Sequence, residues 1–254
     1  MRKTVVIDYL PESVARYRSN HVIVAIDVVR ATTTAITVVE SGHRCFPVPT
    51  IAAAMRAAQE LNNSILAGEQ GGAVPPGFHL NNSPTELLRV TEISRPVVLL
   101  SSSGTRLLHA ASKCQAVFLA CFRNYLSVAR HIAALDFPHI AVIGAGSRGE
   151  FRAEDQMCCA WVAECLTAGG YRPANRETLT TIDQWSNKPI DSWIDGKSAA
   201  YLRNSGQLAD LDFILEHVGD LAAPFSLIRG EVIKGDGARD IVEAEARKGR
   251  DDVR

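Results

Sequence analysis

Four segments of the sequence carry clustered polar side chains directly after a short apolar run. They are residues 27–34, 68–72, 101–106 and 144–155, and they supply four carboxylates, those of Asp27, Glu69, Glu154 and Asp155. Carboxylates without a histidine or cysteine cluster suit Mg²⁺, which keeps waters and substrate phosphate oxygens among its ligands. The residues by themselves therefore predict phosphate chemistry with Mg²⁺.

Groups that could hold an anion lie in the same segments. At what is expected to be a helix start, Arg30 stands beside the hydroxyls of Thr32, Thr33 and Thr34, where hydroxyls and free N–H groups can bind phosphate. In residues 101–106, a glycine among hydroxyls can turn backbone N–H groups toward an anion that Arg106 would grip bidentately. The alternatives are that Asp27 or a threonine only caps the helix, and that residues 101–106 form an ordinary Ser/Gly loop.

Residues 68–84 form a glycine- and proline-rich stretch that is too polar for a core. Glu69 comes just after an apolar run, which is a good position for a metal ligand or a general base. Asn82-Ser83-Pro84 is typical of a helix start. His79 stands alone in this loop, and a lone loop histidine is more often a surface residue than a catalyst, so we place it outside the expected site.

Residues 144–149 contain G-x-G-x-x-G between an expected strand and an expected helix, as in dinucleotide-binding proteins. We do not interpret them as a cofactor loop, because carboxylates crowd the helix start and would repel a diphosphate. No second strand ending in an acid follows at the distance that ribose binding requires. Glu154 and Asp155 could simply favour the helix dipole; the sharper interpretation is that one of them binds metal with other strand-end acids. No P-loop and no G-x-S-x-G motif occurs.

The elements that must position these segments alternate between short β-branched runs and longer amphipathic stretches. We expect strands at 5–8, 22–27, 44–48, 64–67, 97–101, 116–120 and 140–144, and helices at 51–61, 105–111, 125–135 and 153–168. Continuous apolar runs fit strands buried on both faces of a parallel sheet. The predicted fold class is α/β, a three-layer α/β/α arrangement with a mostly parallel sheet, whose ligands bind at the carboxyl ends of the strands.

The chain changes character after about residue 172. Strong strand signals disappear there, and Trp185, Trp193, Tyr201 and residues 208–218 indicate short helices that pack as a flank. We therefore expect one α/β domain over 1–235 with a helical C-terminal appendage, followed by a charged tail over 236–254.

Composition narrows the functional class. The 254 residues are 46% hydrophobic and 22% charged, and 27 Lys and Arg balance 28 Asp and Glu. A nucleic-acid partner would require a basic excess, and no apolar run is long enough to span a bilayer. With no signal-peptide h-region and six cysteines outside any C-x-x-C pair, we expect a cytoplasmic protein with buried, unpaired thiols and no membrane partner. Whether it forms a homo-oligomer is left open.

Seven short motifs occur in an order that resembles the 2-phosphosulfolactate phosphatase (ComB-like) family over roughly residues 4–235. They are residues 27–34, Gly68-Glu69, Gly77-Phe78 with Asn82-Ser83-Pro84, residues 103–106, Phe122 with Asn124, Ala145-Gly146 and Glu154-Asp155. The resemblance implies an α/β, Mg²⁺-dependent acid phosphatase that converts (2R)-phospho-3-sulfolactate to 3-sulfolactate and phosphate, a step of coenzyme M biosynthesis in methanogens. It also implies a small anionic phosphorylated substrate as the partner.

On this hypothesis the site residues take three roles. The catalytic set is Asp27, Arg30, Glu69, Glu154 and Asp155, and within it Mg²⁺ is expected on Asp27, Glu69 and Asp155. Spacing does not decide whether Asp27 is a metal ligand or the nucleophile. The expected substrate- and phosphate-binding residues are Thr32, Thr33, Thr34, Asn82, Ser83, Ser102, Ser103, Gly104, Thr105, Arg106, Arg123 and Asn124.

The chain also departs from the family pattern. Gln70 stands where the family usually has arginine, and Arg123 stands where a small or aliphatic residue is common. Arg123 is therefore expected to replace the missing cation. Asn81 and Ser103 depart from the family pattern as well. Because the changes at Gln70, Asn81 and Ser103 touch the anion pocket, the alternative function is a non-catalytic binder of small phosphorylated or sulfonated acids on the same fold. A nicotinamide-dependent oxidoreductase rests only on residues 144–149.

Overall fold

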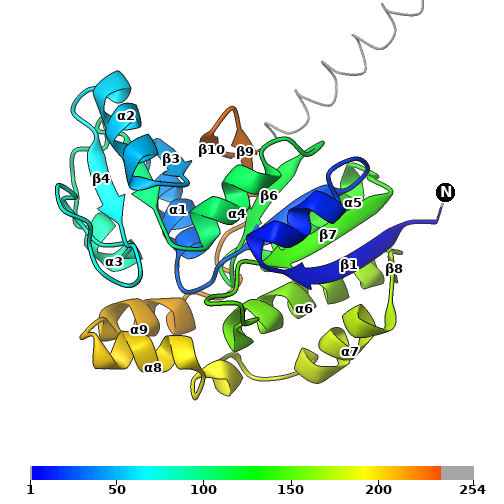
Figure 1. The fold of residues 1–254 in the computed structure, drawn as a ribbon. Helices are drawn as coiled ribbons and strands as arrows, with labels where there is room; N and C mark the ends of the chain where they lie inside the picture. Colours follow the sequence, from blue (N-terminus) through cyan, green and yellow to red (C-terminus); the bar gives the residue numbers. More distant parts are fainter. Residues whose placement is uncertain (1, 236–254) are drawn as a thin grey trace, which may run out of the picture.

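The computed structural model describes residues 2–235, and the expected charged tail over 236–254 lies outside them. One ten-stranded sheet runs through the described chain in the order β4-β5-β3-β10-β9-β6-β2-β7-β1-β8 (Figure 1). Its strands are β1 (Thr4–Tyr9), β2 (Val22–Ile26), β3 (Cys45–Val48), β4 (Ile65–Gly68), β5 (Val97–Leu100), β6 (Val117–Ala120), β7 (His139–Gly144), β8 (Arg172–Pro173), β9 (Phe225–Ile228) and β10 (Glu231–Lys234). All seven strands expected from the sequence are present.

The sheet consists of two parallel groups joined by a hairpin. β4, β5 and β3 form the smaller group, and β6, β2, β7, β1 and β8 form the larger one. The hairpin of β9 and β10 lies between them and pairs antiparallel with β6 on one side and β3 on the other. The expectation that strands end near residue 172 is therefore wrong, because two short C-terminal strands complete the middle of the sheet.

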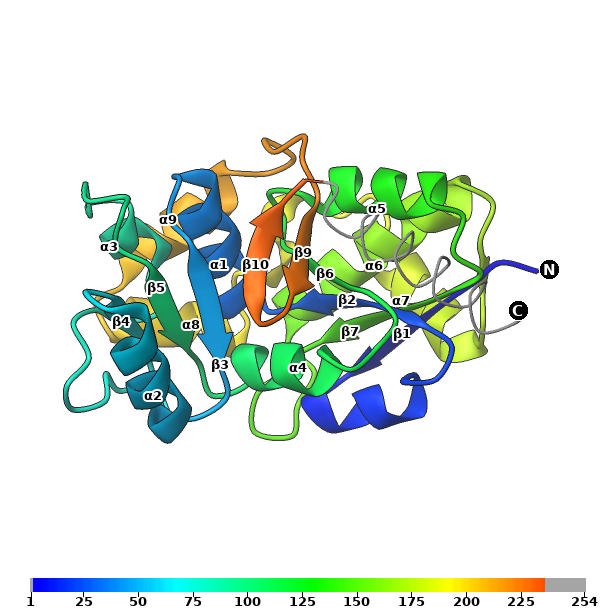
Figure 2. The ribbon, with the colours of Figure 1, turned by 90° about the horizontal axis from the view of Figure 1, so that it is seen from above.

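Sheet twist brings the carboxyl ends of the two groups toward one region. Through the hairpin the groups run in opposite senses, but neighbouring strands rotate by roughly 20–25° each. Over the four steps from β3 to β2 this rotation amounts to roughly a right angle. Figure 2 accordingly shows β3 and β5 running across the direction of β2. The loops that follow β2, β4 and β5 can therefore meet.

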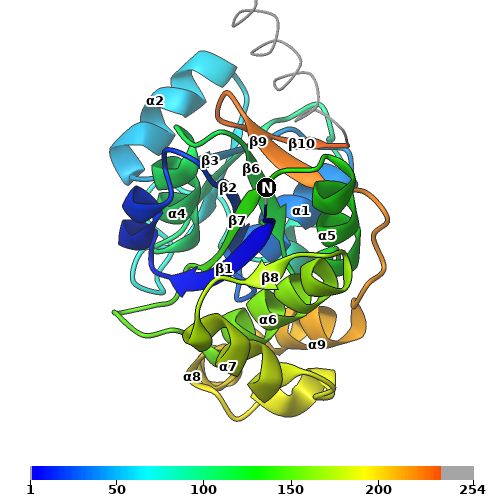
Figure 3. The same cartoon turned by 90° about the vertical axis from the view of Figure 1, so that its right-hand side faces the viewer.

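Helices cover both faces of the sheet and make the expected three layers. Alternate residues of β2 face opposite cores: Val22, Val24 and Ile26 pack on the side of α5, α6 and α7, whereas Ile23 and Ala25 pack on the side of α1 and α4. Figure 3 shows α4 and α5 on opposite sides of the strands. The helices are α1 (Ala31–Glu40), α2 (Ile51–Leu61), α3 (Pro84–Leu87), α4 (Gly104–Ala111), α5 (Tyr125–Ala134), α6 (Ala153–Ala168), α7 (Arg176–Trp185), α8 (Lys197–Asn204) and α9 (Leu208–Glu216), with 3₁₀ turns η1 (Pro11–Arg16) and η2 (Ile190–Trp193).

The helical flank expected after residue 172 is confirmed. Helices α7, α8 and α9 follow one another there, and Trp185, Trp193 and Leu211 bury their side chains in the core of the larger strand group. In Figure 1, α8 and α9 lie below α1 and α3. Within residues 2–235, no helix is long and apolar enough to cross a membrane. All six cysteines are free, and four of them are buried.

Candidate active site

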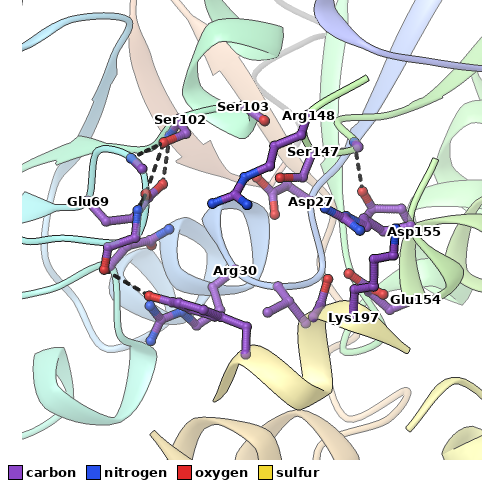
Figure 4. Close-up of a pocket in the computed structure, with 18 of the residues that line it drawn as sticks. Asp27, Arg30, Glu69, Ser102, Ser103, Ser147, Arg148, Glu154, Asp155 and Lys197 are labelled. Carbon is purple, nitrogen blue, oxygen red and sulfur yellow. Dashed lines mark hydrogen bonds between the residues drawn. The ribbon is translucent and has the colours of Figure 1, made fainter. Parts of the chain in front are cut away.

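A cavity of about 460 Å³ opens where the loops after β2, β4, β5 and β7 meet α8. All four polar segments singled out in the sequence contribute to it. Its lining comprises Asp27, Val29, Arg30, Glu69, Gly71, Gly72, Asn82, Ser102, Ser103, Arg106, Gly146, Ser147, Arg148, Arg152, Glu154, Asp155, Lys197, Ser198 and Tyr201. The volume suits a small molecule, and Figure 4 shows the charged side chains around the space. The carboxyl ends of the strands thus deliver a single polar site.

Asp27 is the buried acid at the centre of the lining. It directly follows β2, and its carboxylate accepts a hydrogen bond from the backbone N–H of Ala31, at the start of α1. No side chain among the described residues donates to it. Burial, with a further contribution from the charges of Glu69 and Glu154, raises the pKa of Asp27 to about 7, although the Ala31 N–H and Arg30 act against the rise. A buried carboxylate with open coordination can bind a cation or attack phosphorus.

Asp155 and Glu154, in the first turn of α6, share this environment but differ in their contacts. Asp155 accepts the backbone N–H of Val28 at 2.9 Å through Oδ1 and that of Gly146 at 3.0 Å through Oδ2. It therefore ties the loop after β2 to the loop after β7. Glu154 leaves Oε2 buried with no hydrogen-bond partner. Burial raises the pKa of both groups, and for Asp155 the charges of Asp27 and Glu154 raise it further.

Glu69 joins two loops of the cavity wall. Its Oε1 accepts the backbone N–H of Ser102 at 2.7 Å, and its Oε2 accepts the N–H of Gly72 at 2.7 Å and the Ser102 hydroxyl at 2.9 Å. The loops after β4 and β5 are thus held together by one carboxylate, on the left of Figure 4. Its oxygens are occupied by the protein's own donors.

The carboxylates fit Mg²⁺ as a pair rather than as the expected set of three. Among residues 2–235, no group of three or more His, Cys, Asp and Glu side chains is arranged to hold a metal ion. Both oxygens of Glu69 and of Asp155 accept protein N–H groups. The least committed oxygens are therefore Oε2 of Glu154 and the carboxylate of Asp27, which accepts only the Ala31 N–H among the described residues. One or two carboxylates are sufficient for Mg²⁺ when waters and substrate oxygens complete its shell.

Arg30 and Asp210 form a buried ion pair in the wall of the cavity. The Nη1 of Arg30 donates to Oδ2 of Asp210, and the two side chains are only 3% and 2% exposed. Asp210 belongs to α9 and is 180 residues from its partner in the sequence. Nothing in the local sequence pattern of α9 marks this acid, so it was not among the expected site residues.

The remaining cations of the lining differ in how far they are engaged. Arg106 lies 3.4 Å from Glu12 on the exposed rim, and Arg152 and Lys197 both contact Glu150 at 2.7 Å. Arg148 has no ion-pair or hydrogen-bond partner within the described chain, and Figure 4 shows it extended into the space between Ser103 and Asp27. Arg148 and Lys197 were not among the expected site residues; the clearest signal for Arg148 was its place between Gly146 and Gly149.

The three expected threonines do not line the cavity. Thr32 donates to the carbonyls of Asp27 and Ala120 at 2.8 Å, and Thr33 donates to the carbonyl of Val28 at 2.8 Å. Thr34 is buried, and its hydroxyl has no partner within the described residues. Thr32 and Thr33 therefore secure the loop that carries Asp27. Neither caps the helix, because the N-cap position of α1 is Arg30 and no side-chain capping hydrogen bond is formed there.

Other expected binding residues divide between the lining and its support. Asn82, Ser102, Ser103 and Arg106 line the cavity, and the carbonyl oxygen of the Asn82 side chain is buried without a partner. Gly104 packs against Asp27 from behind. The remaining three bond within the protein. Ser83 caps α3 and donates to Asp210, Thr105 exchanges hydrogen bonds with Ser101, and Asn124 bonds to the backbone of Cys121 and Leu119.

The structure does not bring Arg123 into the cavity. Its guanidinium pairs with Asp220 at 2.6 Å, donates to the Thr37 hydroxyl at 3.0 Å and lies over the ring of Phe213. The expectation that it replaces a missing substrate-binding cation is therefore corrected, because its donors are directed to Asp220, which follows α9, and to Thr37 of α1. His79 is exposed and lies outside the cavity lining, as expected, and its Nδ1 accepts the N–H of Leu66 at 2.9 Å.

Comparisons with known proteins agree with the resemblance found in the motifs. Residues 8–220 match the family model described as 2-phosphosulpholactate phosphatase. A Probable 2-phosphosulfolactate phosphatase of Deinococcus radiodurans is 37% identical over 82% of this chain and 86% of its own length. The protein of the same description from Thermus thermophilus is 31% identical over 83% of this chain and 89% of its own length.

Proposed function

The chain belongs to the 2-phosphosulfolactate phosphatase family, and from that premise we propose that it hydrolyses (2R)-phospho-3-sulfolactate to 3-sulfolactate and phosphate with Mg²⁺ as cofactor. The reaction class, hydrolysis of a phosphoric monoester, is that of the family. One observation carries the proposal: four carboxylates and five cationic side chains line a single small cavity. The carboxylates would bind the metal ion or attack the phosphorus, and the cationic side chains would bind a substrate rich in negative charge.

The charge of the substrate fits the cations of the cavity. A phosphate, a carboxylate and a sulfonate together carry about four negative charges near neutral pH, whereas the whole chain has a net charge of −1. Recognition must therefore come from local cations, and arginine suits it because its planar fork stays charged and pairs bidentately with each of these groups. Arg30, Arg106 and Arg148 are placed to do so.

Asp27 and Glu154 would hold Mg²⁺, since their carboxylates are the least engaged by the protein's own donors. Bound there, the ion would neutralise crowded carboxylates and stabilise charge that develops on the phosphoryl oxygens. Arg30 would hold the phosphoryl group beside Asp27, and the Ser102–Ser103 loop would add hydroxyl and N–H donors. Asp27 is either a metal ligand, with water as the nucleophile, or the nucleophile itself.

Phosphate release from 2-phospho-3-sulfolactate by the purified protein, with Mg²⁺ and with EDTA, tests the activity and its metal dependence. We expect turnover with Mg²⁺, its loss in EDTA, and a fall of at least about 100-fold in Asp27→Asn. Unchanged Mg²⁺-dependent turnover in Asp27→Asn would refute the role of this acid. Thermal stabilisation by phosphate esters without any phosphate release would instead identify a non-catalytic binder.

A rapid acid quench after mixing with ³²P-labelled substrate separates the two routes. If the wild-type protein becomes labelled and the Asp27→Asn variant does not, Asp27 is the nucleophile. Transfer of ¹⁸O from solvent water to phosphate within a single turnover, without a labelled protein, identifies direct attack by water.

A further inference from the structure

Asp210 is a buried acid with no role so far assigned to it. It lies in the first turn of α9, in the C-terminal flank, and is 1% exposed as a whole residue. An ionised carboxylate in such a place requires partners that compensate for the lost water. The identity of those partners indicates what the residue does.

Four donors from two distant parts of the chain converge on this carboxylate. Oδ2 accepts from Nη1 of Arg30. Oδ1 accepts the Ser83 hydroxyl at 2.8 Å, the Thr85 hydroxyl at 2.6 Å and the Thr85 backbone N–H at 3.2 Å. Because Thr85 of α3 and the N-cap residue Ser83 supply three of the donors, the orientation of the carboxylate is fixed independently of Arg30.

Arg30 in turn depends on Asp210 for its position. It lines the cavity beside Asp27, and within residues 2–235 its only other side-chain hydrogen bond is from Nη2 to Oδ1 of Asn81 at 3.4 Å. A guanidinium presents its donors in a rigid fork, so that a carboxylate behind one nitrogen determines where the others point. Without Asp210, the buried cation would be drawn toward the carboxylate of Asp27.

We infer that Asp210 is a positioning residue that holds the guanidinium of Arg30 toward the phosphoryl group of the substrate. Ser83 and Thr85, at the start of α3, hold Asp210 in turn. The inference rests on the proposed function, because it takes Arg30 to contact the phosphoryl group. It assigns α9 to the active site although α9 supplies no residue to the cavity lining.

A double-mutant cycle with Arg30 distinguishes positioning from a general structural role. Wild type, Arg30→Ala, Asp210→Asn and the double variant would be compared by kcat and KM for 2-phospho-3-sulfolactate and by thermal melting. We expect Asp210→Asn to lower kcat/KM by about 10- to 100-fold, the loss typical of a charge-assisted hydrogen bond. In the Arg30→Ala background the same change should cost less than about 3-fold. Asp212→Asn, at an exposed position of the same helix, is the matched control and should be fully active.

Losses that multiply in the double variant, or a fully active Asp210→Asn, would overturn the inference. If Asp210→Asn does not fold, Ser83→Ala/Thr85→Ala leaves the charge pair intact and removes two of its supports. That variant should lose about 3- to 10-fold in kcat/KM, with no loss in the Arg30→Ala background, and multiplicative losses there would again overturn the inference.

Failure of the proposed function would be recognised separately. If the wild-type protein releases no phosphate from 2-phospho-3-sulfolactate, the proposed function is refuted. The affinity of the same four proteins for inorganic phosphate is then measured by calorimetry. Non-additive losses of affinity support positioning of Arg30 by Asp210, and additive losses, or no loss in Asp210→Asn, overturn it.

Discussion

Gly104 lies directly against Asp27, so that the first residue of α4 fixes the place of the buried acid that follows β2. A β-carbon at position 104 would meet Oδ2 of Asp27 and would lie 2.8 Å from its Cβ and 2.5 Å from the Cβ of Ala31. All three contacts would be closer than packed atoms allow. Glycine is therefore required here for close approach, and the strand group that carries α4 and the one that carries Asp27 meet at this contact.

Replacing Gly104 by alanine should lower activity as well as stability. The preference of a helix for alanine over glycine is only about 1 kcal/mol and does not offset the overlap of the added β-carbon with the β-carbons of Asp27 and Ala31, so the loop that carries Asp27 must move. Displacement of a catalytic group by about 1 Å can lower the rate about 100-fold, which is the fall in kcat that we expect from steady-state kinetics. Ala110→Gly, farther along the same helix, should lower the melting temperature and leave kcat unchanged. A fully active Gly104→Ala protein would refute the role of this contact.

Arg148 should bind a substrate anion without contributing to the fold. It is exposed, has no partner within the described residues and extends into the cavity. We expect Arg148→Ala to raise KM about 10-fold or more, since a charge-assisted contact is lost, with an unchanged melting temperature. Arg172→Ala, exposed on β8, removes the same charge at a distance and is the control. Repeating the kinetics with phospholactate identifies the anion: the effect disappears if Arg148 binds the sulfonate and persists if it binds phosphate or carboxylate. An unchanged KM for both substrates would contradict the prediction.

Arg123 should behave in the opposite way. Its contacts with Asp220 and Thr37 attach the chain that leads to β9. Arg123→Ala should lower the free energy of unfolding by about 2 kcal/mol, because it removes charged hydrogen bonds, while KM stays within about 2-fold of wild type. Denaturant unfolding and substrate titration measure the two quantities. A stable variant with a raised KM would restore the expectation that Arg123 binds substrate.

The pKa of Asp27 predicts how stability depends on pH in the metal-free protein. Burial, with the charges of Glu69 and Glu154, raises this pKa from 3.8 to about 7, so the folded state binds a proton more tightly than the unfolded chain. Stability from this group is fully present below pH 4 and is lost as pH rises through 7. The Asp27→Asn variant lacks this titrating group and loses no such stability between pH 4 and pH 8. The melting temperature of the variant minus that of the wild type should therefore be larger at pH 8 than at pH 4.

Added Mg²⁺ provides the control for this pH effect. At pH 8 it should raise the melting temperature of the wild type more than that of Asp27→Asn, because a bound ion stabilises only the state that binds it. If the difference in melting temperature between the metal-free wild type and Asp27→Asn is the same at pH 4 and pH 8, Asp27 does not titrate as expected.

The sequence predicts the parallel strands well and misses the hairpin for a physical reason. β2 is buried on both faces and therefore appears as one apolar run, Val22–Ile26. β9 and β10 are four residues each and partly exposed, so neither forms such a run. Their signal was the two-residue turn Arg229-Gly230, whose positive φ values of 51° and 84° are typical of a tight hairpin.

The candidate site was predicted where chemistry is local and missed where it depends on distant partners. The carboxylates after each strand could be identified because parallel strands deliver their carboxyl ends to one region. The role of a hydroxyl cannot be predicted from local sequence, because threonine donates to a backbone carbonyl, as Thr32 and Thr33 do, as readily as to a phosphate. Arg123 and Asp210 were misjudged or missed because their partners lie 97 and 180 residues away in the chain.

The place of the β9–β10 hairpin also determines the order in which the molecule can be assembled. During synthesis, β3 and β6 leave the ribosome long before residues 225–234 and meanwhile expose unpaired N–H and C=O groups. Such edges recruit strands from other chains, and contacts this distant in sequence form slowly. A nascent or truncated chain that lacks the hairpin should therefore bind chaperones and aggregate even though most of its catalytic loops have been made. The last strands of the described residues protect the middle of the sheet.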